Sequence, residues 1–284
     1  MLAWLSVRSA GGTLRMRVED IDGPRVKPDA AAQAFEDIAW LGLDFDGEPM
    51  FQSKRLSIYA DAVAHLMDEG LAYPCVCSRK EIEEAASAPH ESWQDAVVYP
   101  GTCRDHFASL DEAKATTGKD PAVRFCVDVD SVPFEDGFLG GQEGLIRGDF
   151  VIQKRDGGPA YQLAVVIDDA DTGIGEVLRG DDLLVSTPRQ LLLYEALGWT
   201  PPGFLHVPLV VGEDGRRLAK RHGDTSLRRF REAGVPTETV VGDLAWLCGF
   251  RSEPEACAAS ELLEGFDLGR LGPEAAVARE PWCL

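Results

Sequence analysis

Apolar residues switch between strand-like and helical spacing along the first 70 residues, and this pattern constrains the fold more than any other feature. Residues 13–20 read TLRMRVED, in which apolar and charged side chains alternate as in a strand with one buried face. Residues 28–41 and 56–67 carry apolar side chains at helical spacing, and residues 2–9 resemble the last turns of another helix. Helices and strands that alternate in this way are typical of an α/β layer, so we expect an α/β fold.

Residues 71–144 have a different texture and predict a subdomain inserted into this layer. They contain an acidic stretch without clear periodicity and one strand-like run, VRFCVDV, at 123–129. The layer then resumes at 149–169, which we interpret as two strands joined at a turn, Asp156-Gly157-Gly158. The predicted division is a core of residues 1–70 and 145–222, an insertion of residues 71–144, and a small helical appendage of residues 223–284.

The composition indicates an acidic cytoplasmic protein with room for a local basic cleft. The 284 residues carry a formal net charge of -20, which argues against a protein that coats nucleic acid nonspecifically. No apolar run approaches the roughly 20 residues of a membrane helix, and the start lacks the basic residues and cleavage site of a signal peptide. The number of cysteines is odd, seven, and four of them are scattered along the chain. This pattern favours a reducing compartment over a disulfide framework.

Three of the cysteines gather in one segment and predict a metal site. Cys75, Cys77 and Cys103 lie in YPCVC and VYPGTC, with Tyr99 four residues before the last. Zinc in structural sites takes four tetrahedral ligands, most of them thiolates. The spacing leaves the fourth position to Tyr99, His90, His106 or Asp105, and it is also compatible with three ordinary reduced thiols.

A basic loop interrupts the acidic sequence at residues 212–227, which read GEDGRRLAKRHGDTSL. Its cations include Arg216, Arg217, Lys220 and Arg221, and phosphate oxygens are bound well by such side chains. The loop matches neither a P-loop nor a glycine-rich dinucleotide motif. It is therefore either a mobile clamp for a polyphosphate or a solvated hairpin tip.

Three polar residues stand where strands are predicted to end or apolar runs to begin. They are Glu19 at the end of TLRMRVED, Tyr161 in GPAYQLAVV, and Arg179 at the end of GEVLRG. The carboxyl ends of strands line the ligand crevice in open α/β sheets. A carboxylate, a phenol and a guanidinium that converge there suit a zwitterionic amino acid, whereas separately they are solvated strand ends.

Three segments of the chain carry a resemblance to a known family. These are RVEDIDGPR, the block from DFVIQKRDGGPAYQ to LLLYEALGW, and RLAKR. They occur in the same order as in class I glutamyl-tRNA synthetases, and the chain resembles the catalytic core of that family. The resemblance implies a Rossmann-type parallel sheet with a zinc-bearing insertion. It places glutamate against Glu19, Tyr161 and Arg179, and ATP, with Mg²⁺, against Lys220. The Cys-x-Cys and Tyr-x-x-x-Cys pattern is similar to the zinc site of the shortened members of the family, the glutamyl-queuosine tRNA(Asp) synthetases. By that likeness Cys75, Cys77, Tyr99 and Cys103 are the zinc ligands.

The activity that this resemblance implies has two steps. Glutamate attacks the α-phosphorus of ATP to give glutamyl-adenylate, and the glutamyl group then passes to queuosine in tRNA(Asp). We expect a monomer, with alignment and charge stabilisation rather than a protein base as the source of catalysis. The alternatives are a fragment of a conventional synthetase that charges tRNA(Glu), or a non-catalytic relic that binds RNA or a partner.

The resemblance begins inside the family's first helix. We therefore expect that the first strand, with its glutamate-contacting arginine, and the ATP-binding histidines belong to sequence upstream of a misplaced start. The stub from Met1 to Leu5 is then expected to be uncovered and hydrophobic, and the 284-residue form to be poorly stable and inactive.

Overall fold

The computed structural model of the protein describes residues 1–21, 29–85, 98–212 and 227–277. The helices are α1 (Leu2–Ser9), α2 (Ala30–Trp40), α3 (Leu56–Asp68), α4 (Arg79–Ala85), α5 (Leu110–Thr117), α6 (Tyr161–Asp171), α7 (Thr187–Ala196), α8 (Leu227–Glu232) and α9 (Thr237–Leu247). The strands are β1 (Arg17–Val18), β2 (Met50–Phe51), β3 (Ala72–Cys75), β4 (Ala122–Phe125), β5 (Phe134–Asp136), β6 (Gly140–Gln142), β7 (Phe150–Gln153), β8 (Glu176–Gly180), β9 (Gly203–Val207), β10 (Val210–Val211) and β11 (Ala276–Val277).

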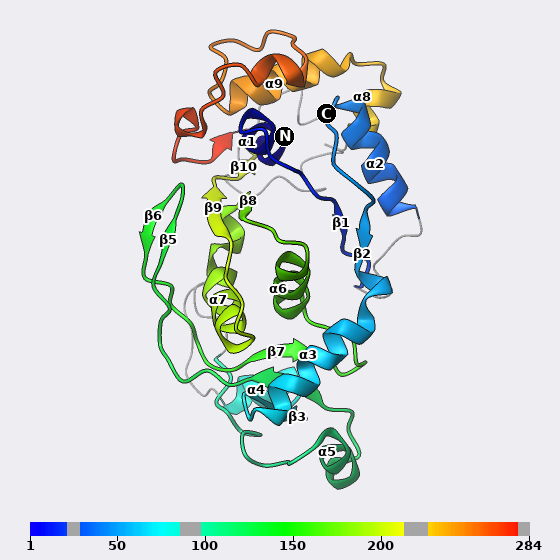
Figure 1. Ribbon diagram of the computed structural model, residues 1–284, viewed down its shortest axis with the longest axis vertical. Coiled ribbons are helices and arrows are strands. Elements are labelled where there is room, and N and C mark those ends of the chain that lie inside the picture. The colour runs from blue at the N-terminus through cyan, green and yellow to red at the C-terminus, as the bar shows by residue number, and fades with distance from the viewer. Residues whose placement is uncertain (22–28, 86–97, 213–226, 278–284) are drawn as a thin grey trace.

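The molecule is elongated (Figure 1). Helices α1, α8 and α9 lie at one end, α6 and α7 in the middle, and β3, β4 and α5 at the other end. Helices α8 and α9 confirm the expected helical character of the C-terminal appendage. Within the described residues, no helix is both long enough and apolar enough to span a membrane.

Parallel pairing, which the α/β prediction requires, occurs in three places. Strand β1 pairs with β2, β8 with β9, and β10 with β11, all in parallel. The described strands form these as separate two-stranded sheets rather than as one continuous sheet. Between the residues of β1 and those of β8 lies a cavity of about 670 Å³, so the edges of these two strands do not meet.

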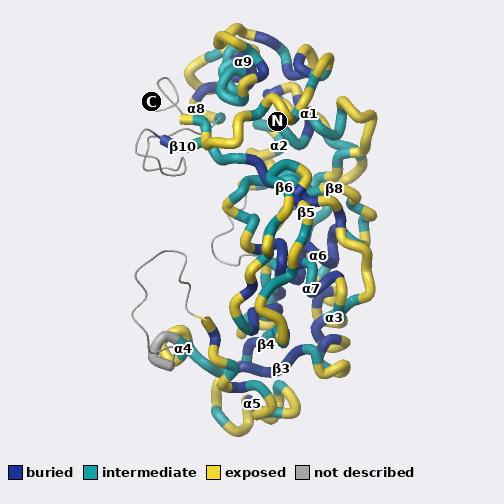
Figure 2. Tube along the Cα trace, turned by 90° about the vertical axis from the view of Figure 1, so that its left-hand side faces the viewer, coloured by how far each residue is buried: buried dark blue, intermediate teal, exposed yellow. Residues whose placement is uncertain are grey.

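The predicted second strand of residues 149–169 is wrong. Strand β7 forms as expected, but the apolar run after the turn is helix α6. Its buried residues include five in succession, Leu163 to Ile167, so the helix is apolar on every side and shows no amphipathic period. A short unbroken apolar run has the same pattern in a buried strand and in a buried helix. Figure 2 shows α6 and α7 among the most buried parts of the molecule.

The strands of the insertion share a sheet with the core. Strand β4 pairs antiparallel with β3 on one side and with β7 on the other. Val123 on β4 and Ile152 on β7 are fully buried in the same hydrophobic cluster as Leu163 on α6. The insertion and the middle of the molecule are therefore packed around one common core.

The expected exposure of the N-terminal stub is also wrong. Leu5 is fully buried and Trp4 is 7% exposed, in a cluster that contains Val240 and Val241 of α9. The Trp4 indole Nε1 donates a hydrogen bond of 2.6 Å to Asp44. The C-terminal helices cover the apolar face of α1, and no local sequence pattern reveals a contact between segments so far apart.

Candidate functional site

The three clustered cysteines converge with Tyr99 at the end of β3. The Sγ atoms of Cys75, Cys77 and Cys103 all lie within 4.8 Å of one another, with Cys77 and Cys103 3.3 Å apart. The Tyr99 hydroxyl oxygen lies 3.4 Å from the Cys75 sulfur and 3.7 Å from the Cys77 sulfur. Gly101, at a φ of 76°, provides the left-handed turn that brings Cys103 back beside Tyr99.

These four side chains fit a tetrahedral zinc ion. A Zn–S bond of about 2.3 Å places neighbouring sulfur ligands about 3.8 Å apart, close to the separations found here. The Tyr99 oxygen is fixed because it accepts the backbone N–H of Cys103 at 2.8 Å. Among the described residues, no histidine or carboxylate joins the three thiols, so Asp105 and His106 are not part of the cluster. His90, the remaining alternative, lies outside the described residues.

Two arginines support the cluster from outside. Arg124 on β4 donates from Nε to the Cys75 sulfur at 3.2 Å, and its guanidinium lies 3.8 Å from the centre of the Tyr99 ring. Arg155 donates 2.8 Å hydrogen bonds to the carbonyl oxygens of Val76 and Cys77. Burial raises the pKa of the Cys77 thiol to about 12, so a cation would be needed to make it a thiolate ligand.

The second cluster is centred on Arg179, which lies opposite His206 in the parallel pair of β8 and β9. The Arg179 Nε donates to His206 Nε2 at 2.9 Å, and Nη2 donates to the Thr187 hydroxyl at 2.8 Å. The other nitrogen of His206, Nδ1, lies 2.6 Å from Asp136 Oδ2. Because Nε2 accepts from a guanidinium, the imidazole is neutral and carries its proton on Nδ1.

Tyr161 lies within electrostatic range of Arg179 and also of Glu19. Burial raises the pKa of the Tyr161 phenol, the charge of Arg179 lowers it, and the charge of Glu19 raises it. Tyr161 begins helix α6 rather than preceding a strand, and it remains 37% exposed. Glu19 directly follows β1. The three predicted glutamate contacts therefore come from a helix, a strand and the end of another strand, and Tyr161 is the one that senses the charges of the other two.

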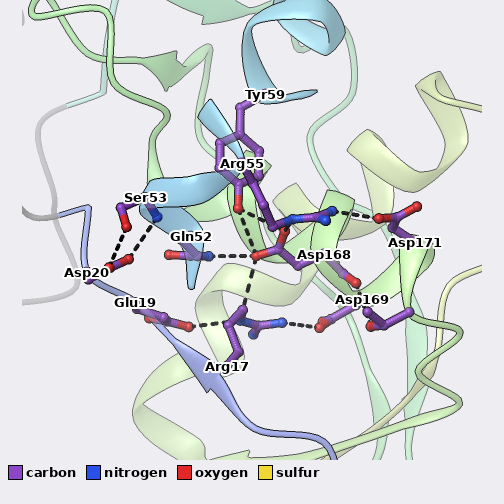
Figure 3. A network of polar contacts seen from close by, with 11 residues as sticks. Arg17, Glu19, Asp20, Gln52, Ser53, Arg55, Tyr59, Asp168, Asp169 and Asp171 are labelled. Carbon is purple, nitrogen blue, oxygen red and sulfur yellow. Dashed lines mark hydrogen bonds and ion pairs between the residues drawn. The ribbon is translucent and has the colours of Figure 1, made fainter. Parts of the chain in front are cut away.

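Arg17 connects this environment to a buried carboxylate network, which the sequence interpretation missed (Figure 3). Arg17 forms an ion pair with Asp169 through Nη1 and lies 3.4 Å from Glu19 through Nε. Its Nε is also 3.9 Å from Asp168, which is fully buried. The sequence did contain a signal for this network, namely the two adjacent acids Asp168 and Asp169 directly after the apolar run of α6. Acidic residues are rarely buried without cationic partners, so acids beside a buried run indicate a nearby arginine or lysine.

Asp168 is held by three donors from one neighbouring segment. Gln52 Nε2, Arg55 Nε and the Tyr59 hydroxyl each lie 2.8 Å from one of its oxygens. Burial raises the pKa of Tyr59, which keeps this phenol a hydrogen-bond donor. The network links Asp168 on α6 to Tyr59 on α3 and to Gln52 and Arg55 just before α3 (Figure 3).

Lys220, the predicted ATP contact, lies outside the described residues, as does most of the basic loop around it. The structure therefore places the predicted glutamate and zinc residues, while the placement of Lys220 stays a prediction.

Comparisons with known proteins give the family. Residues 1–278 match the family described as tRNA synthetases class I (E and Q), catalytic domain. The chain is 47% identical to a Glutamyl-Q tRNA(Asp) synthetase of Symbiobacterium thermophilum, over 96% of this chain and 88% of that protein. It is 46% identical to a protein of the same name from Rhodopirellula baltica, over 93% of this chain and 83% of that protein.

The fold has a close counterpart among solved structures. A glutamate tRNA ligase from Elizabethkingia meningosepticum, in complex with its amino acid, superposes with a TM-score of 0.80 at 24% identity. The alignment covers 99% of this chain and 63% of that one. The mixed α/β architecture is thus the class I catalytic fold, and this chain belongs to the class I tRNA synthetases of the E and Q type.

Proposed function

We propose that the protein activates glutamate with ATP and transfers the glutamyl group to queuosine of tRNA(Asp). The observation that carries the proposal is the arrangement of Arg179, which His206 and Thr187 hold in place, with Tyr161 within electrostatic range of both Arg179 and Glu19. Arg179 suits a carboxylate of the substrate, and Glu19 suits its ammonium group. Identities of 47% and 46% to two proteins named Glutamyl-Q tRNA(Asp) synthetase support the choice of acceptor.

The partners of Arg179 favour an anionic ligand. Its hydrogen bonds go to a neutral imidazole, a hydroxyl and the carbonyl oxygen of Leu183, so the guanidinium keeps its positive charge available. Burial lowers the pKa of Arg179 toward the neutral form, and an incoming carboxylate would offset that cost. We assign Lys220 to the phosphates of ATP, together with Mg²⁺, on the strength of its place in the RLAKR loop.

We further assign one structural zinc ion to Cys75, Cys77, Tyr99 and Cys103. The ion would supply a cross-link between the end of β3 and the loop that carries Tyr99 and Cys103. Arg124 and Arg155 hold that loop and the residues after β3 in position. We assign residues 71–144 to the insertion, the flanking segments 1–70 and 145–222 to the catalytic core, and 223–284 to the appendage. A monomer in the cytoplasm fits this role.

The proposal is tested by charging assays with three RNAs. We expect radiolabelled glutamate to end on tRNA(Asp) that contains queuosine, and neither on tRNA(Asp) that lacks it nor on tRNA(Glu). Nuclease digestion of the labelled tRNA separates the two attachment sites, because the label then stays either with the anticodon fragment or with the 3′ terminal adenosine. Glutamate on the 3′ end of tRNA(Glu) would replace this function by conventional charging. Because the 284-residue form is expected to be inactive, exchange is measured also on a form extended upstream by the family's first strand and ATP-binding histidines, and failure of glutamate-dependent exchange between pyrophosphate and ATP by that form would favour a non-catalytic role.

A further inference from the structure

A carboxylate from the insertion reaches the core behind Arg179. Asp136 ends β5, and the hairpin of β5 and β6 lies beside β9 (Figure 1). The backbone N–H of Gly137 donates to the carbonyl oxygen of Phe204 on β9 at 2.8 Å. A side-chain carbon at position 137 would lie 2.9 Å from Leu205, so glycine favours this close approach. The hairpin therefore delivers Asp136 to the strand that carries His206.

The two oxygens of Asp136 have different partners. Oδ1 accepts three backbone N–H groups, those of Phe138, Leu139 and His206, at 2.9–3.1 Å. Oδ2 lies 2.6 Å from the Nδ1 atom of His206. Asp136 is 2% exposed and His206 is fully buried. The carboxylate is therefore held in one orientation, with Oδ2 directed at the imidazole ring.

The opposite side of the ring holds Arg179. His206 Nε2 accepts from Arg179 Nε at 2.9 Å, and the Thr187 hydroxyl accepts from Nη2 at 2.8 Å. Thr187 Oγ1 also lies 3.3 Å from His206 Nε2. Two of the three guanidinium nitrogens are thus held, which fixes the plane of the guanidinium. Because arginine has donors only, this arrangement requires a lone pair on Nε2 and the ring proton on Nδ1.

We propose that Asp136 and His206 are positioning residues of the glutamate site, and that the Asp136 carboxylate aims Arg179 at the substrate by selecting the imidazole tautomer. The inference rests on the proposed function for the identity of the substrate. It extends the site across the boundary between the core and the insertion, to which Asp136 belongs. A carboxylate that serves stability alone predicts no link between the tautomer and the affinity for glutamate.

The substitution Asp136→Asn tests the tautomer with almost no change in side-chain volume. The three backbone N–H groups need an acceptor, so the amide oxygen takes the place of Oδ1 and the amide nitrogen faces His206. An N–H group directed at Nδ1 requires a lone pair there, which moves the ring proton to Nε2. This proton then opposes the Nε donor of Arg179, and Nε2 competes with Nη2 for the Thr187 hydroxyl. The variant should therefore release the guanidinium.

Nitrogen NMR of the full chain with isotope-labelled histidine shows which ring nitrogen carries the proton. The spectra are recorded at about pH 8, above the pKa of His206, which burial lowers. We expect the proton on Nδ1 in the wild type and on Nε2 in Asp136→Asn. The signal of His206 is identified by its loss in His206→Asn.

The matched control is Asp149→Asn, because Asp149 is also buried but accepts from the Tyr73 hydroxyl and the backbone N–H of Val127 rather than from a histidine. This control should keep the wild-type tautomer of His206. Isothermal titration of the same proteins gives the affinity for glutamate. We expect Asp136→Asn to weaken glutamate binding roughly tenfold, as for one misaligned hydrogen bond of a charged group, and to affect ATP binding much less. Asp149→Asn should bind glutamate like the wild type.

Two substitutions of His206 keep the inference testable if circular dichroism melting shows that Asp136→Asn is not folded. His206→Gln reaches the position of Nε2 with its amide oxygen and can still accept from Arg179. His206→Asn can donate to Asp136 but leaves the Nε donor of Arg179 without its acceptor. We therefore expect His206→Gln to retain glutamate affinity better than His206→Asn.

The outcomes separate this inference from the proposed function. An unchanged tautomer in folded Asp136→Asn, or a switched tautomer with wild-type glutamate affinity, would overturn the inference and leave the proposed function intact. Equal glutamate affinities of His206→Gln and His206→Asn would also overturn it. No glutamate binding by the wild type, in either the 284-residue or the extended form, would refute the proposed function and with it the role of these residues.

Discussion

At the residue scale, the site is governed by how buried charges find partners. Arg179 is oriented by a neutral imidazole, and that imidazole is oriented by Asp136. Burial alone would raise the pKa of Asp136, but hydrogen bonds from His206 and from nearby backbone amides lower it overall. The carboxylate thus fixes the histidine tautomer, and the tautomer presents a lone pair to Arg179.

The first prediction concerns the glutamate contacts. Arg179→Ala and Tyr161→Phe should weaken glutamate binding much more than ATP binding, because both side chains belong to the proposed glutamate site and lie within electrostatic range of each other. Loss of a charged hydrogen-bond partner costs about 1.5–3 kcal/mol, which corresponds to roughly 10–150-fold in affinity. Isothermal titration with each ligand separately measures the effect. Small and equal losses for both ligands would return these residues to the role of solvated surface groups.

The second prediction concerns the metal. Purified protein should contain about one zinc, and Cys75→Ser or Cys103→Ser should lose it, because each thiolate supplies one of four ligands. Cys126→Ser is the control, since Cys126 does not belong to the three-thiol cluster. Tyr99→Phe is the sharper probe, with zinc content measured by plasma mass spectrometry. Unchanged zinc in Tyr99→Phe would assign the fourth position to another group.

The third prediction concerns pH. Burial lowers the pKa of His206 in the folded protein, while Asp136 raises it and Arg179 lowers it; Asp181 also raises it. The unfolded histidine, with a pKa of about 6.5, takes up a proton on acidification before the folded one does. His206 therefore contributes fully to the stability of the folded protein above about pH 6.5. This contribution is lost as the pH falls from there through the pKa of His206 in the folded protein.

Urea unfolding of the wild type and of His206→Gln at several pH values between 8 and 5 measures this contribution. The wild type should lose stability more steeply than the variant in this window. Parallel curves would show that His206 titrates alike in the folded and unfolded protein.

At the scale of elements, helices α1 and α6 show how neighbours decide exposure. Helix α6 is surrounded by α3, α7 and β7, so most of its surface is buried (Figures 1 and 2). Leu5 of helix α1 is buried in one cluster with residues of the C-terminal helices, such as Val240 of α9. These residues are more than 200 positions apart in the sequence. The appendage therefore stabilises the start of the chain.

The fourth prediction tests this contact. Leu5→Ala should lower the free energy of unfolding by about 2–5 kcal/mol, because Leu5 is fully buried and its truncation leaves a cavity. Leu56→Ala is the matched control, since Leu56 is 50% exposed and should have a much smaller effect. Chemical denaturation of both variants gives the two values. Equal and small losses would mean that α1 is not packed against the C-terminal helices.

At the scale of the whole molecule, strand β4 joins the insertion to the middle of the chain. It pairs with β3, which carries Cys75, and with β7, which leads to α6. Val123 on β4 is buried in the cluster that contains Leu163 and Tyr59. The cysteine cluster and the central helices therefore share one sheet rather than belonging to independent units.

The fifth prediction follows from this continuity. Treatment with a chelator that removes zinc should reduce the hydrogen-exchange protection of β3–β4–β7 and of the central helices together, because the sheet shares its core with α3 and α6. Hydrogen exchange resolved by peptide, with and without chelator, measures this. Loss of protection confined to residues 98–117 would show that the metal stabilises only its own loop.

The sequence by itself determined the features that depend on local spacing. The segment GEVLRG was predicted as a short strand that ends near Arg179, and the helical period predicted α2 and α3. The close spacing of Cys75, Cys77 and Cys103 indicated a possible metal site, and their sulfur atoms do converge. These features are encoded over a few residues, because side-chain direction repeats every 2 residues in a strand and about every 3.6 in a helix.

Only the tertiary structure decided which distant side chains meet. It turned the run after Tyr161 into a buried helix, covered Leu5, and brought Arg17 to Asp169. It also left the Nε atom of Arg189 buried without a hydrogen-bond partner. Local spacing carries no information on such contacts, because whether a polar or apolar side chain is buried, paired or exposed depends on the elements that pack against it.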